Sequence, residues 1–495
     1  MHKSSLIEIL RTFTKQELAN FEDFVRSPYF NKKDNVLKLF LEIKKYDPEF
    51  TDANLEKEKI WVKVFPEKEY NYGIMKNLIF DLNKLIEQFM IDLKLSRDEF
   101  RKTEYLMNSL LDRDLNKIFI NKFKSLSEIP DIKNLNFGNL NISDQMDYIN
   151  KMYFIKLYYH HQYEQNFNPE ELMDRKDSFL ISGFLVKLFG AFNDSFANCD
   201  SRKSDIQKKT VTKLLELISP GMKSITESIR KTSAINSDYV NIYFAMYNTL
   251  IEKTEQRYIE FKNIVAENLN ILPKSNIQAL HHCLATAVKF TEFKNLNKNR
   301  EMMEILDSMI EHNTITELRN DKIPVHIFTT YTSLCKLFSD SVKLKTFSER
   351  YLDKLDPEVR KNTGIHVKFM ISFIDKSYNE ALHYLSMLDI PYVFLKTTLR
   401  LDKAKCLYET DNYEIFLNEQ DSMKHFLNNK LVLEREKKSL LLRFSTIKKL
   451  FELKHNFDKY EFKKLRVHIE ENFKNNTGNW FIEKLEEIEQ LKVKS

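Results

Sequence analysis

Apolar residues recur along almost the whole chain at intervals of three and four, the spacing that gathers side chains on one face of an α-helix. One set with this spacing comprises Leu78, Ile79, Leu82, Leu85, Ile86 and Phe89. No segment shows the sustained alternation of apolar and polar residues that would indicate a half-buried strand. The pattern predicts an all-α protein built of amphipathic helices.

Turn-forming residues support this prediction. The 495 residues include only 7 glycines and 10 prolines, whereas sheets with tight turns use many of both. The prolines stand where the helical spacing breaks, because proline lacks the N–H group that a helix interior requires. Thr14 and Glu17 have the spacing of a capping box, so we expect a helix to begin after Thr14.

The chain is longer than one hydrophobic core supports, so we expect more than one domain. The segment 130–143 is rich in asparagine and contains Gly138, which favours a linker. We predict an N-terminal helical module over residues 1–129, a linker over 130–143, and a long series of helices over 144–495.

Two segments in the C-terminal half are similar to each other. The stretch FIDKSYNEALHYL begins at Phe373 and YETDNYEIFLNEQ begins at Tyr408, a shift of 35 residues. This shift pairs aromatic residues with each other and leucine with leucine, namely Phe373 with Tyr408, Tyr378 with Tyr413, and Leu382 with Leu417. The two segments resemble the tetratricopeptide repeat, whose period is close to 34 residues.

This resemblance implies two helices per repeat that cross closely at a small residue of the second helix, here Ala381. The second copy departs from the family pattern, because Phe416 stands where a small residue belongs. Further helix breaks, too irregular in spacing for standard repeats, lie near Thr254, Asn297, Val342 and Phe457. We therefore predict a degenerate tetratricopeptide-like α-solenoid over 144–495, in which each hairpin buries its apolar face on its neighbours.

Within the N-terminal module, residues 35–90 predict three helices in a helix-turn-helix-like order. Trp61, Phe65 and Pro66 precede a polar turn and a long third helix. The segment resembles the tri-helical core of bacterial winged-helix regulators, and the run SPYFNK resembles bacterial helical proteins with no assigned activity. The first resemblance implies DNA binding through the third helix, with Lys76 and Asn77 as candidate contacts.

The charge of this segment argues against DNA binding. Residues 54–92 contain six lysines and seven acidic residues, and no arginine lies between Ser27 and Ser96. DNA affinity depends on clustered lysine and arginine, and arginine is the commonest reader of bases. The whole chain has a formal net charge of +5, close to neutral for its length. We expect the third helix to serve its own core, and we do not expect nucleic acid as a partner.

Two other segments are candidates for partner contact. Tyr29 and Phe30 follow a helix that ends at Ser27, and they either plug a gap between helices or bind a partner. The segment 429–454 carries eight basic and three acidic residues, with Arg435 and Lys438 as candidate contacts. We interpret this segment as a solvated helix surface, with contact to an acidic partner or RNA as the alternative.

The sequence contains no recognisable catalytic or metal-binding pattern. Its glycines are too scattered for a phosphate-binding loop, and neither HExxH nor GxSxG occurs. The pairs His160–His161 and His281–His282 point about 100° apart on a helix and cannot hold one metal, although His160 and Glu164 could. The four cysteines lack CxxC spacing, so we expect buried thiols. We predict no enzyme activity, no metal and no cofactor.

The most apolar segment, Ser178–Phe192, contains one charged residue, Lys187. A transmembrane helix needs about 20 apolar residues, so we expect a buried central helix and no membrane span, with interfacial membrane binding as the alternative. The first residues carry charges and no apolar core, which predicts no signal peptide. We expect a cytoplasmic, non-enzymatic scaffold that binds a protein or peptide. A DNA-binding transcription regulator is the alternative, and an enzyme is a third class that no motif supports.

Overall fold

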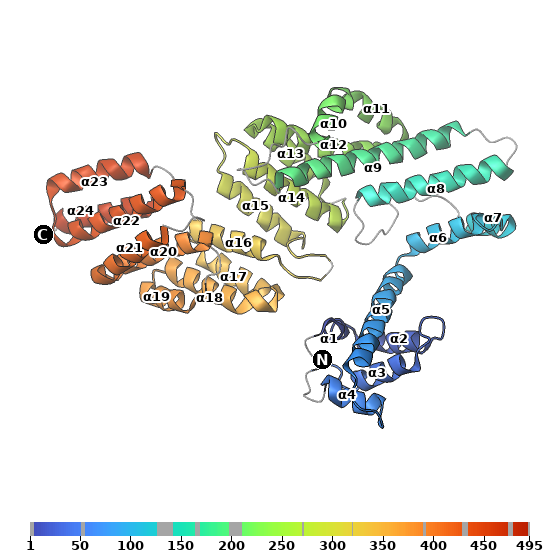
Figure 1. The fold of residues 1–495 in the computed structure, drawn as a ribbon. Coiled ribbons are helices and arrows are strands. Elements are labelled where there is room, and N and C mark those ends of the chain that lie inside the picture. Colours follow the sequence, from blue (N-terminus) through green and yellow to red (C-terminus); the bar gives the residue numbers. More distant parts are fainter. Residues whose placement is uncertain are drawn as a thin grey trace. The chain divides into compact units, whose positions relative to one another are not determined.

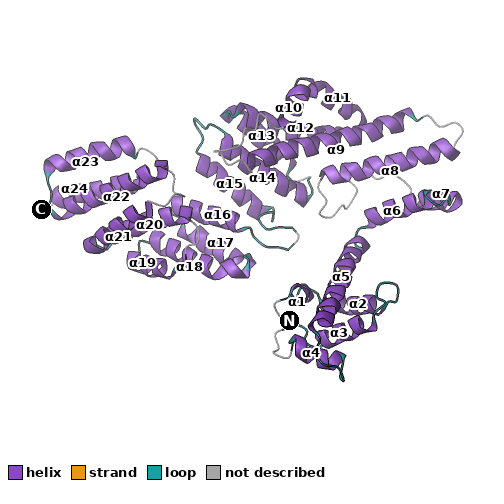
Figure 2. Cartoon of the chain, in the orientation of Figure 1, coloured by secondary structure: helices purple, strands orange, loops and turns teal. Residues whose placement is uncertain are grey.

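The computed structural model of the chain is built of helices (Figures 1 and 2). It describes residues 4–50, 55–125, 142–163, 169–197, 210–269, 272–318, 320–389, 393–427, 434–473 and 479–493. Helices make up 82% of these described residues, and no strand forms among them. A single β-bridge in these ranges pairs Thr254 with Glu292. The all-α prediction is confirmed.

The chain divides into two compact units. The first comprises Met1–Lys133 and Tyr148–Met173, and the second comprises Asn134–Asp147 and Asp174–Ser495. The predicted linker 130–143 lies outside the described residues except for its last two positions. The first unit continues beyond the predicted end at residue 129, because it also takes in Tyr148–Met173.

The first unit contains a core of aromatic and aliphatic side chains around one long helix. Its first helices are α1 (Ser5–Leu10), α2 (Lys15–Arg26), α3 (Asp34–Lys44), α4 (Lys57–Val64) and α5 (Tyr72–Ser96). Helices α1, α2 and α3 pack on α5, and α4 packs on α3. The Phe21 ring meets the rings of Phe40 and Phe89 at centroid distances of 4.9 and 5.2 Å. The predicted capping box is confirmed, since Thr14 accepts from the Glu17 N–H and Glu17 accepts from the Thr14 N–H.

A second, smaller core in the same unit joins α6 (Glu99–Leu111), α7 (Asn116–Ser125) and the part of α8 (Ile142–Tyr163) from Tyr148 onward. Its buried members are Met107, Leu110, Phe119, Met152, Ile155 and Tyr159. Lys151 on α8 forms an ion pair with Glu104 on α6 at 3.1 Å. These contacts explain why the first unit includes residues beyond 147.

Helix α9 (Glu170–Ala197) contains the apolar segment 178–192. Phe189 and Phe192 are buried and pack against Tyr247. At Gly183 an added Cβ would lie 3.2 Å from the Cβ of Met146, so this glycine allows the close approach of a neighbouring helix. Leu180, Ile181 and Phe184 are exposed, so the helix is buried on one side rather than all round. By length and composition alone α9 could cross a membrane, but half of its most apolar window is buried.

The second unit continues as a series of helices that pack on their neighbours in sequence. They are α10 (Thr210–Ile218), α11 (Met222–Thr232), α12 (Ala234–Glu252), α13 (Glu255–Asn268), α14 (Lys274–Phe290), α15 (Lys298–Glu311), α16 (Val325–Leu337), α17 (Ser341–Tyr351), α18 (Pro357–Ile374), α19 (Tyr378–Met387), α20 (Val393–Glu409), α21 (Tyr413–Leu427), α22 (Glu434–His455), α23 (Lys459–Asn472) and α24 (Asn479–Val493). Short 3-10 turns occupy Ser219–Gly221 and Leu352–Lys354.

Helices α12, α16, α20 and α22 also contact the helix two places further on, so hairpins stack side by side.

Several hairpin turns use a left-handed residue that is not glycine. Lys253, Ser339, Lys376 and Asp411 have φ between 56° and 60°. At three of these turns the next residue donates its N–H to a carbonyl five residues back, as in a Schellman motif: Asp340 to Cys335, Ser377 to Ser372, and Asn412 to Leu407. This backbone capping lets a chain with seven glycines make sharp helix–helix turns. The last three left-handed residues follow one another at intervals of 37 and 35 residues.

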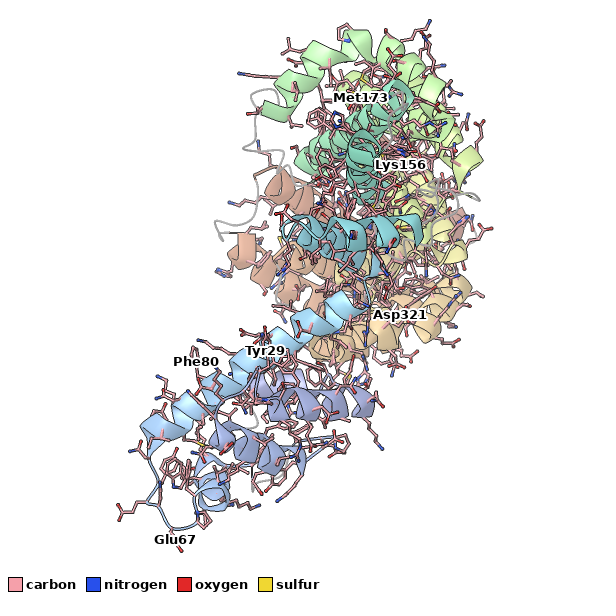
Figure 3. All side chains as sticks on the ribbon, turned by 90° about the vertical axis from the view of Figure 1, so that its right-hand side faces the viewer. Tyr29, Glu67, Phe80, Lys156, Met173 and Asp321 are labelled. Carbon is pink, nitrogen blue, oxygen red and sulfur yellow. The ribbon has the colours of Figure 1, made fainter. Side chains whose placement is uncertain are left out.

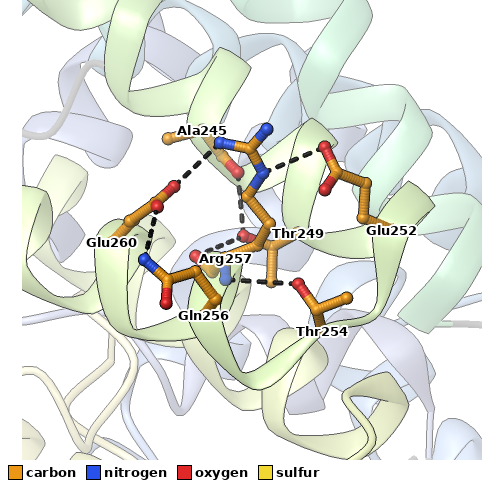
Figure 4. A network of polar contacts seen from close by, with 7 residues as sticks. All are labelled: Ala245, Thr249, Glu252, Thr254, Gln256, Arg257 and Glu260. Atoms are coloured by element: carbon orange, nitrogen blue, oxygen red, sulfur yellow. Dashed lines mark hydrogen bonds and ion pairs between the residues drawn. The ribbon is translucent and has the colours of Figure 1, made fainter.

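Polar side chains hold the turn between α12 and α13 (Figure 4). The Arg257 guanidinium lies 2.9 Å from the carboxylates of both Glu252 and Glu260, and so ties the end of one helix to the start of the next. The Thr249 hydroxyl lies 3.0 Å from the Arg257 carbonyl, and Thr254 caps α13 through the Arg257 N–H. The predicted helix break near Thr254 is therefore a hairpin turn.

Candidate functional site

The predicted repeat-packing residues of the α18–α19 hairpin lie together in one core. Ala381 is fully buried. The Phe373 and Tyr378 rings meet edge to face with centroids 5.9 Å apart, and Leu382 is half-buried beside them. The same core includes residues of α16, α17 and α20.

In the next hairpin, Tyr408 is buried, and Tyr413 and Leu417 pack at the edge of the C-terminal core. The Tyr408 and Tyr413 rings both contact Phe451 on α22. Phe416, which departs from the repeat pattern, is fully buried and stacks on Phe444 at 5.9 Å. A large residue at this position therefore fills space against α22.

More hairpins share an equivalent buried position than the comparison of the two sequence segments found. The fourth residue of every odd-numbered helix from α13 to α23 is buried. These residues are Tyr258, Glu301, Leu344, Ala381, Phe416 and Phe462. The sequence does not reveal this equivalence, because the six residues differ in type, from alanine to glutamate, and because the number of residues between them varies.

Replacing Ala381 with phenylalanine should lower the free energy of unfolding by roughly 1–3 kcal/mol, because the added ring overpacks a fully buried site. Urea unfolding followed by circular dichroism measures this change. Ala381→Ser adds one atom and provides the control, with a smaller loss. An unchanged urea midpoint for the phenylalanine variant would contradict the close packing of α18 and α19.

Helix α5 turns its apolar face toward its own core. Met75, Leu78 and Leu82 are buried, whereas Lys76 and Asn77 are exposed. The exposed side also carries Glu87 and an apolar ring, Phe80, which is 56% exposed (Figure 3). Among residues 55–125 no strand follows α5 in the position of a wing. Lys76 and Asn77 thus lie on a mixed surface that lacks clustered positive charge.

Replacing both Lys76 and Asn77 with alanine should change the free energy of unfolding by less than about 0.5 kcal/mol, as exposed positions usually do. We also expect no salt-dependent shift of random duplex DNA by micromolar wild-type protein in a gel assay. A shift at low salt that the double variant abolishes would make DNA binding the leading interpretation.

In the loop after α2, one of the two aromatic residues packs against the helices and the other is exposed to solvent. Phe30 stacks on Phe24 with ring centroids 3.9 Å apart, so it is the plug between helices. Tyr29 is 83% exposed (Figure 3) and its ring meets only the edge of Phe30 among the described rings. Asn31 fixes the loop by donating to the Val25 carbonyl at 3.0 Å. Tyr29 therefore remains a candidate for partner contact.

The described part of the predicted basic segment, residues 434–454, lies in α22. Lys438 is exposed, and the side chain of Arg435 lies outside the described residues. Leu440, Phe444 and Ile447 form the buried side of the helix. Arg443 was not singled out from the sequence, yet it is half-buried on this helix, and its Nε has no hydrogen-bond partner among the described residues.

Among the described residues, the histidine pairs and three of the four cysteines lack the arrangement of a reactive centre, and Cys199 lies outside those residues. No group of three histidine, cysteine or acidic side chains among the described residues could hold a metal ion, and Glu164 lies outside those residues. His281 bridges the hydroxyls of Thr314 and Ser308, both at 2.9 Å, and its burial lowers its pKa to about 4. Cys283, Cys335 and Cys406 are buried thiols, as predicted, and burial raises their pKa.

The most unusual group of side chains lies between α16, α18, α20 and α22. We name it the Lys405 cluster, and its members are Lys336, His366, Asp402, Lys405 and Arg443. The Lys336 ammonium pairs with the Asp402 carboxylate, and their side chains are only 17% and 7% exposed. Lys405 and Arg443 make no hydrogen bond or ion pair with any described residue. The cluster therefore holds three cations and one carboxylate.

Aromatic rings surround the cations of the Lys405 cluster. The Lys336 ammonium lies 4.5 Å from the centroid of the Phe373 ring. The Lys405 ammonium lies 5.2 Å from the Trp480 ring and 5.8 Å from the Phe481 ring, both on α24. Such rings attract cations through their negative faces, but they do not neutralise charge. They hold Lys405 in place without supplying a counter-ion.

Burial and mutual repulsion change the titration of this cluster. Burial lowers the pKa of Lys405 to about 8, the nearby Asp402 carboxylate opposes this shift, and the positive charges of Lys336 and Arg443 add to it. Burial and the Lys336 charge lower the pKa of His366 to about 4, so His366 is neutral at pH 7. His366 is 6% exposed, and its Nε2 has no hydrogen-bond partner among the described residues. With His366 neutral, Lys336, Lys405 and Arg443 outnumber the single carboxylate of Asp402, so the cluster carries a net positive charge.

The sequence contains one signal for this site. The 35-residue repeat shift aligns Asp402 with Val367 and Lys405 with Met370, both buried apolar residues. Asp402 and Lys405 are thus charged at two positions where the preceding repeat has apolar core residues. The other members lie on different helices, and no sequence spacing connects them.

Replacing Lys405 with methionine should raise the free energy of unfolding at pH 7 by roughly 1–3 kcal/mol, because a protonated lysine in the wild type opposes folding. The folded pKa of about 8 lies below the ordinary value of 10.5, so the unfolded chain binds more protons between these pH values. Wild-type stability should rise across that window through this residue, and the variant should lack the rise. Urea midpoints between pH 6 and 10 measure both effects, with Lys449→Met on the exposed side of α22 as the control. A less stable variant at pH 7 would contradict the account.

A second feature is a cavity of about 660 Å³ beside α15 and the turn after α16. Its charged wall includes Glu301, the fourth residue of α15. The Tyr258 hydroxyl donates to Glu301 at 2.8 Å, and the Lys262 ammonium binds Glu301 and Glu304 at 2.6 and 2.7 Å. Both bonds to the buried Glu301 carboxylate end on its Oε2 atom, and this network links neighbouring hairpins.

Comparison of the chain with protein-family models, with curated proteins and with solved structures finds no match to any of them.

Proposed function

We propose that the chain is a non-enzymatic scaffold that binds a protein or peptide segment on helices α16 to α24. In this proposal the hairpins of the second unit form a degenerate tetratricopeptide-like superhelix. The recurring left-handed turns and the shared buried register of the odd-numbered helices support the repeat architecture. Solenoids of this kind present a continuous surface built from equivalent helices, which suits an extended ligand.

The observation that carries the proposal is the Lys405 cluster. Buried charge without a partner is costly, and a chain selected only for stability would place apolar residues there. Val367 and Met370 do so at the equivalent positions of α18. Lys405 and Arg443 instead keep unpaired charge on two neighbouring helices, which indicates a ligand that supplies the missing negative charge.

Selection from a displayed peptide library, used both untreated and after enzymatic phosphorylation of its serines and threonines, tests this function with the full chain as bait. We expect peptides that bind the wild type and Lys449→Met alike and that lose at least tenfold in affinity for Lys405→Met/Arg443→Met. Selected peptides that bind all three proteins equally would place the binding surface elsewhere. Failure to select any peptide would contradict the scaffold function.

A further inference from the structure

We infer that the Lys405 cluster receives a phosphate group, a doubly charged anion carried by the bound segment. The inference rests on the proposed peptide-binding function and adds the chemistry of the ligand. It follows from the number of charges in the cluster, from the free donors, and from the way the rings fix Lys405.

The charge of the cluster matches a dianion. Asp402 neutralises Lys336, and the positive charges of Lys405 and Arg443 remain. A phosphorylated serine or threonine carries about −1.5 to −2 charges at pH 7, whereas a glutamate or aspartate side chain carries one. One phosphate group therefore neutralises both cations, and a single carboxylate leaves one of them uncompensated in a partly buried site.

The free donors also suit a phosphate. Arg443 has an unpartnered buried Nε–H, and a guanidinium presents its N–H groups in a fork that fits phosphate oxygens. His366 Nε2 is buried and unpartnered, so in the tautomer that carries the proton there it adds a neutral donor. Lys405 supplies a third donor. The three donors lie on α18, α20 and α22, and a phosphate group has three terminal oxygens that accept hydrogen bonds.

The position of Lys405 is set before any ligand arrives. Trp480 lies under the Lys405 ammonium, and its indole Nε1–H donates to Glu409 at 2.7 Å. The buried Lys484 ammonium binds the same Glu409 carboxylate at 3.0 Å. The ring is therefore held at its edge by a hydrogen bond to a carboxylate that an ion pair fixes in turn, and the Lys405 side chain rests against this fixed ring. A donor fixed in this way loses little conformational entropy on binding.

Phosphate binding is testable by the fluorescence of Trp480 in a Trp61→Phe background, since the chain has two tryptophans. The probes are inorganic phosphate, N-acetyl-phosphoserine amide and N-acetyl-glutamate amide at constant ionic strength. We expect saturable binding of the two phosphates with Kd on the order of 1 mM, and at least tenfold weaker binding of the glutamate compound. Lys405→Met/Arg443→Met should weaken phosphate binding at least tenfold, and Lys449→Met should leave it unchanged. Binding should also weaken above pH 8, as Lys405 loses its proton in the free protein.

The outcomes separate this inference from the proposed function. Equal affinity for the phosphoserine and glutamate compounds would show that one negative charge suffices and would overturn the inference. Phosphate binding that the double variant retains would also overturn it, because the site would lie elsewhere. If displayed peptides bind through the cluster but phosphate does not, the scaffold function stands without the phosphate. If no peptide binds, the function itself fails.

Discussion

Replacing Asp402 with alanine should lower the free energy of unfolding of the second unit by roughly 3–5 kcal/mol, the usual cost of leaving one member of a buried ion pair alone. The Asp402 side chain is 7% exposed, and it is the carboxylate that pairs with Lys336. Its loss leaves Lys336, Lys405 and Arg443 to repel one another in a partly buried space.

Urea unfolding followed by Trp480 fluorescence in the Trp61→Phe background measures this loss in the unit that contains the pair. Asp421→Ala is the matched control, since Asp421 pairs with Lys424 on an exposed surface, and it should leave the urea midpoint nearly unchanged. Adding Lys336→Met to Asp402→Ala should restore much of the stability, because both charges are then gone. A loss below about 1 kcal/mol for Asp402→Ala would contradict a charge-dense site between α16 and α20.

Replacing Leu82 with alanine should lower the free energy of unfolding of the first unit by roughly 2–5 kcal/mol. Leu82 is fully buried in the N-terminal core beneath α5, so truncation leaves a cavity that rigid neighbouring helices cannot close. Trp61 lies in the same core, and its fluorescence in a Trp480→Phe background follows this unit alone. The exposed Lys76→Ala is the control on the same helix. Similar small effects of both substitutions would mean that α5 is not held by its own core.

The sequence predicted the helices well because each helix repeats its apolar pattern locally. The face of α5 that carries Leu82 and the cap at Thr14 follow from residues three and four apart, which helical geometry alone brings together. The half-exposed α9 was predicted less well. Composition shows that its 178–192 segment is apolar, but only the neighbouring helices decide that Phe189 is covered and Phe184 is not.

The repeat register was only partly predictable. Tyr258 and Glu301 are each the fourth residue of their helix, and they form a hydrogen bond across neighbouring hairpins. A repeat pattern that expects an apolar residue at this position does not match a glutamate. The irregular spacing of the turns hides the relation further. The structural rule, a buried fourth residue in each odd-numbered helix, concerns geometry rather than residue type.

The Lys405 cluster lay beyond sequence reasoning for a different reason. Its members come from four helices between residues 336 and 443, and only packing places them together. In the sequence, Lys405 and Arg443 do not differ from the many other basic residues, and only the structure shows that they are partly buried and have no partner among the described residues. The sequence pattern offered the exposed Lys438 only as a candidate contact on a segment interpreted as solvated surface, whereas burial without a partner is what makes a charged residue informative.

The most direct test of the scaffold account is hydrogen exchange of the full chain with and without a peptide obtained by display selection. If the segment binds the Lys405 cluster, amide protons of α16, α18, α20 and α22 should exchange more slowly in the complex, while those of α1 to α5 keep their rates. Slowed exchange confined to α1 to α5, or unchanged rates in all four helices of the cluster, would contradict binding at this site.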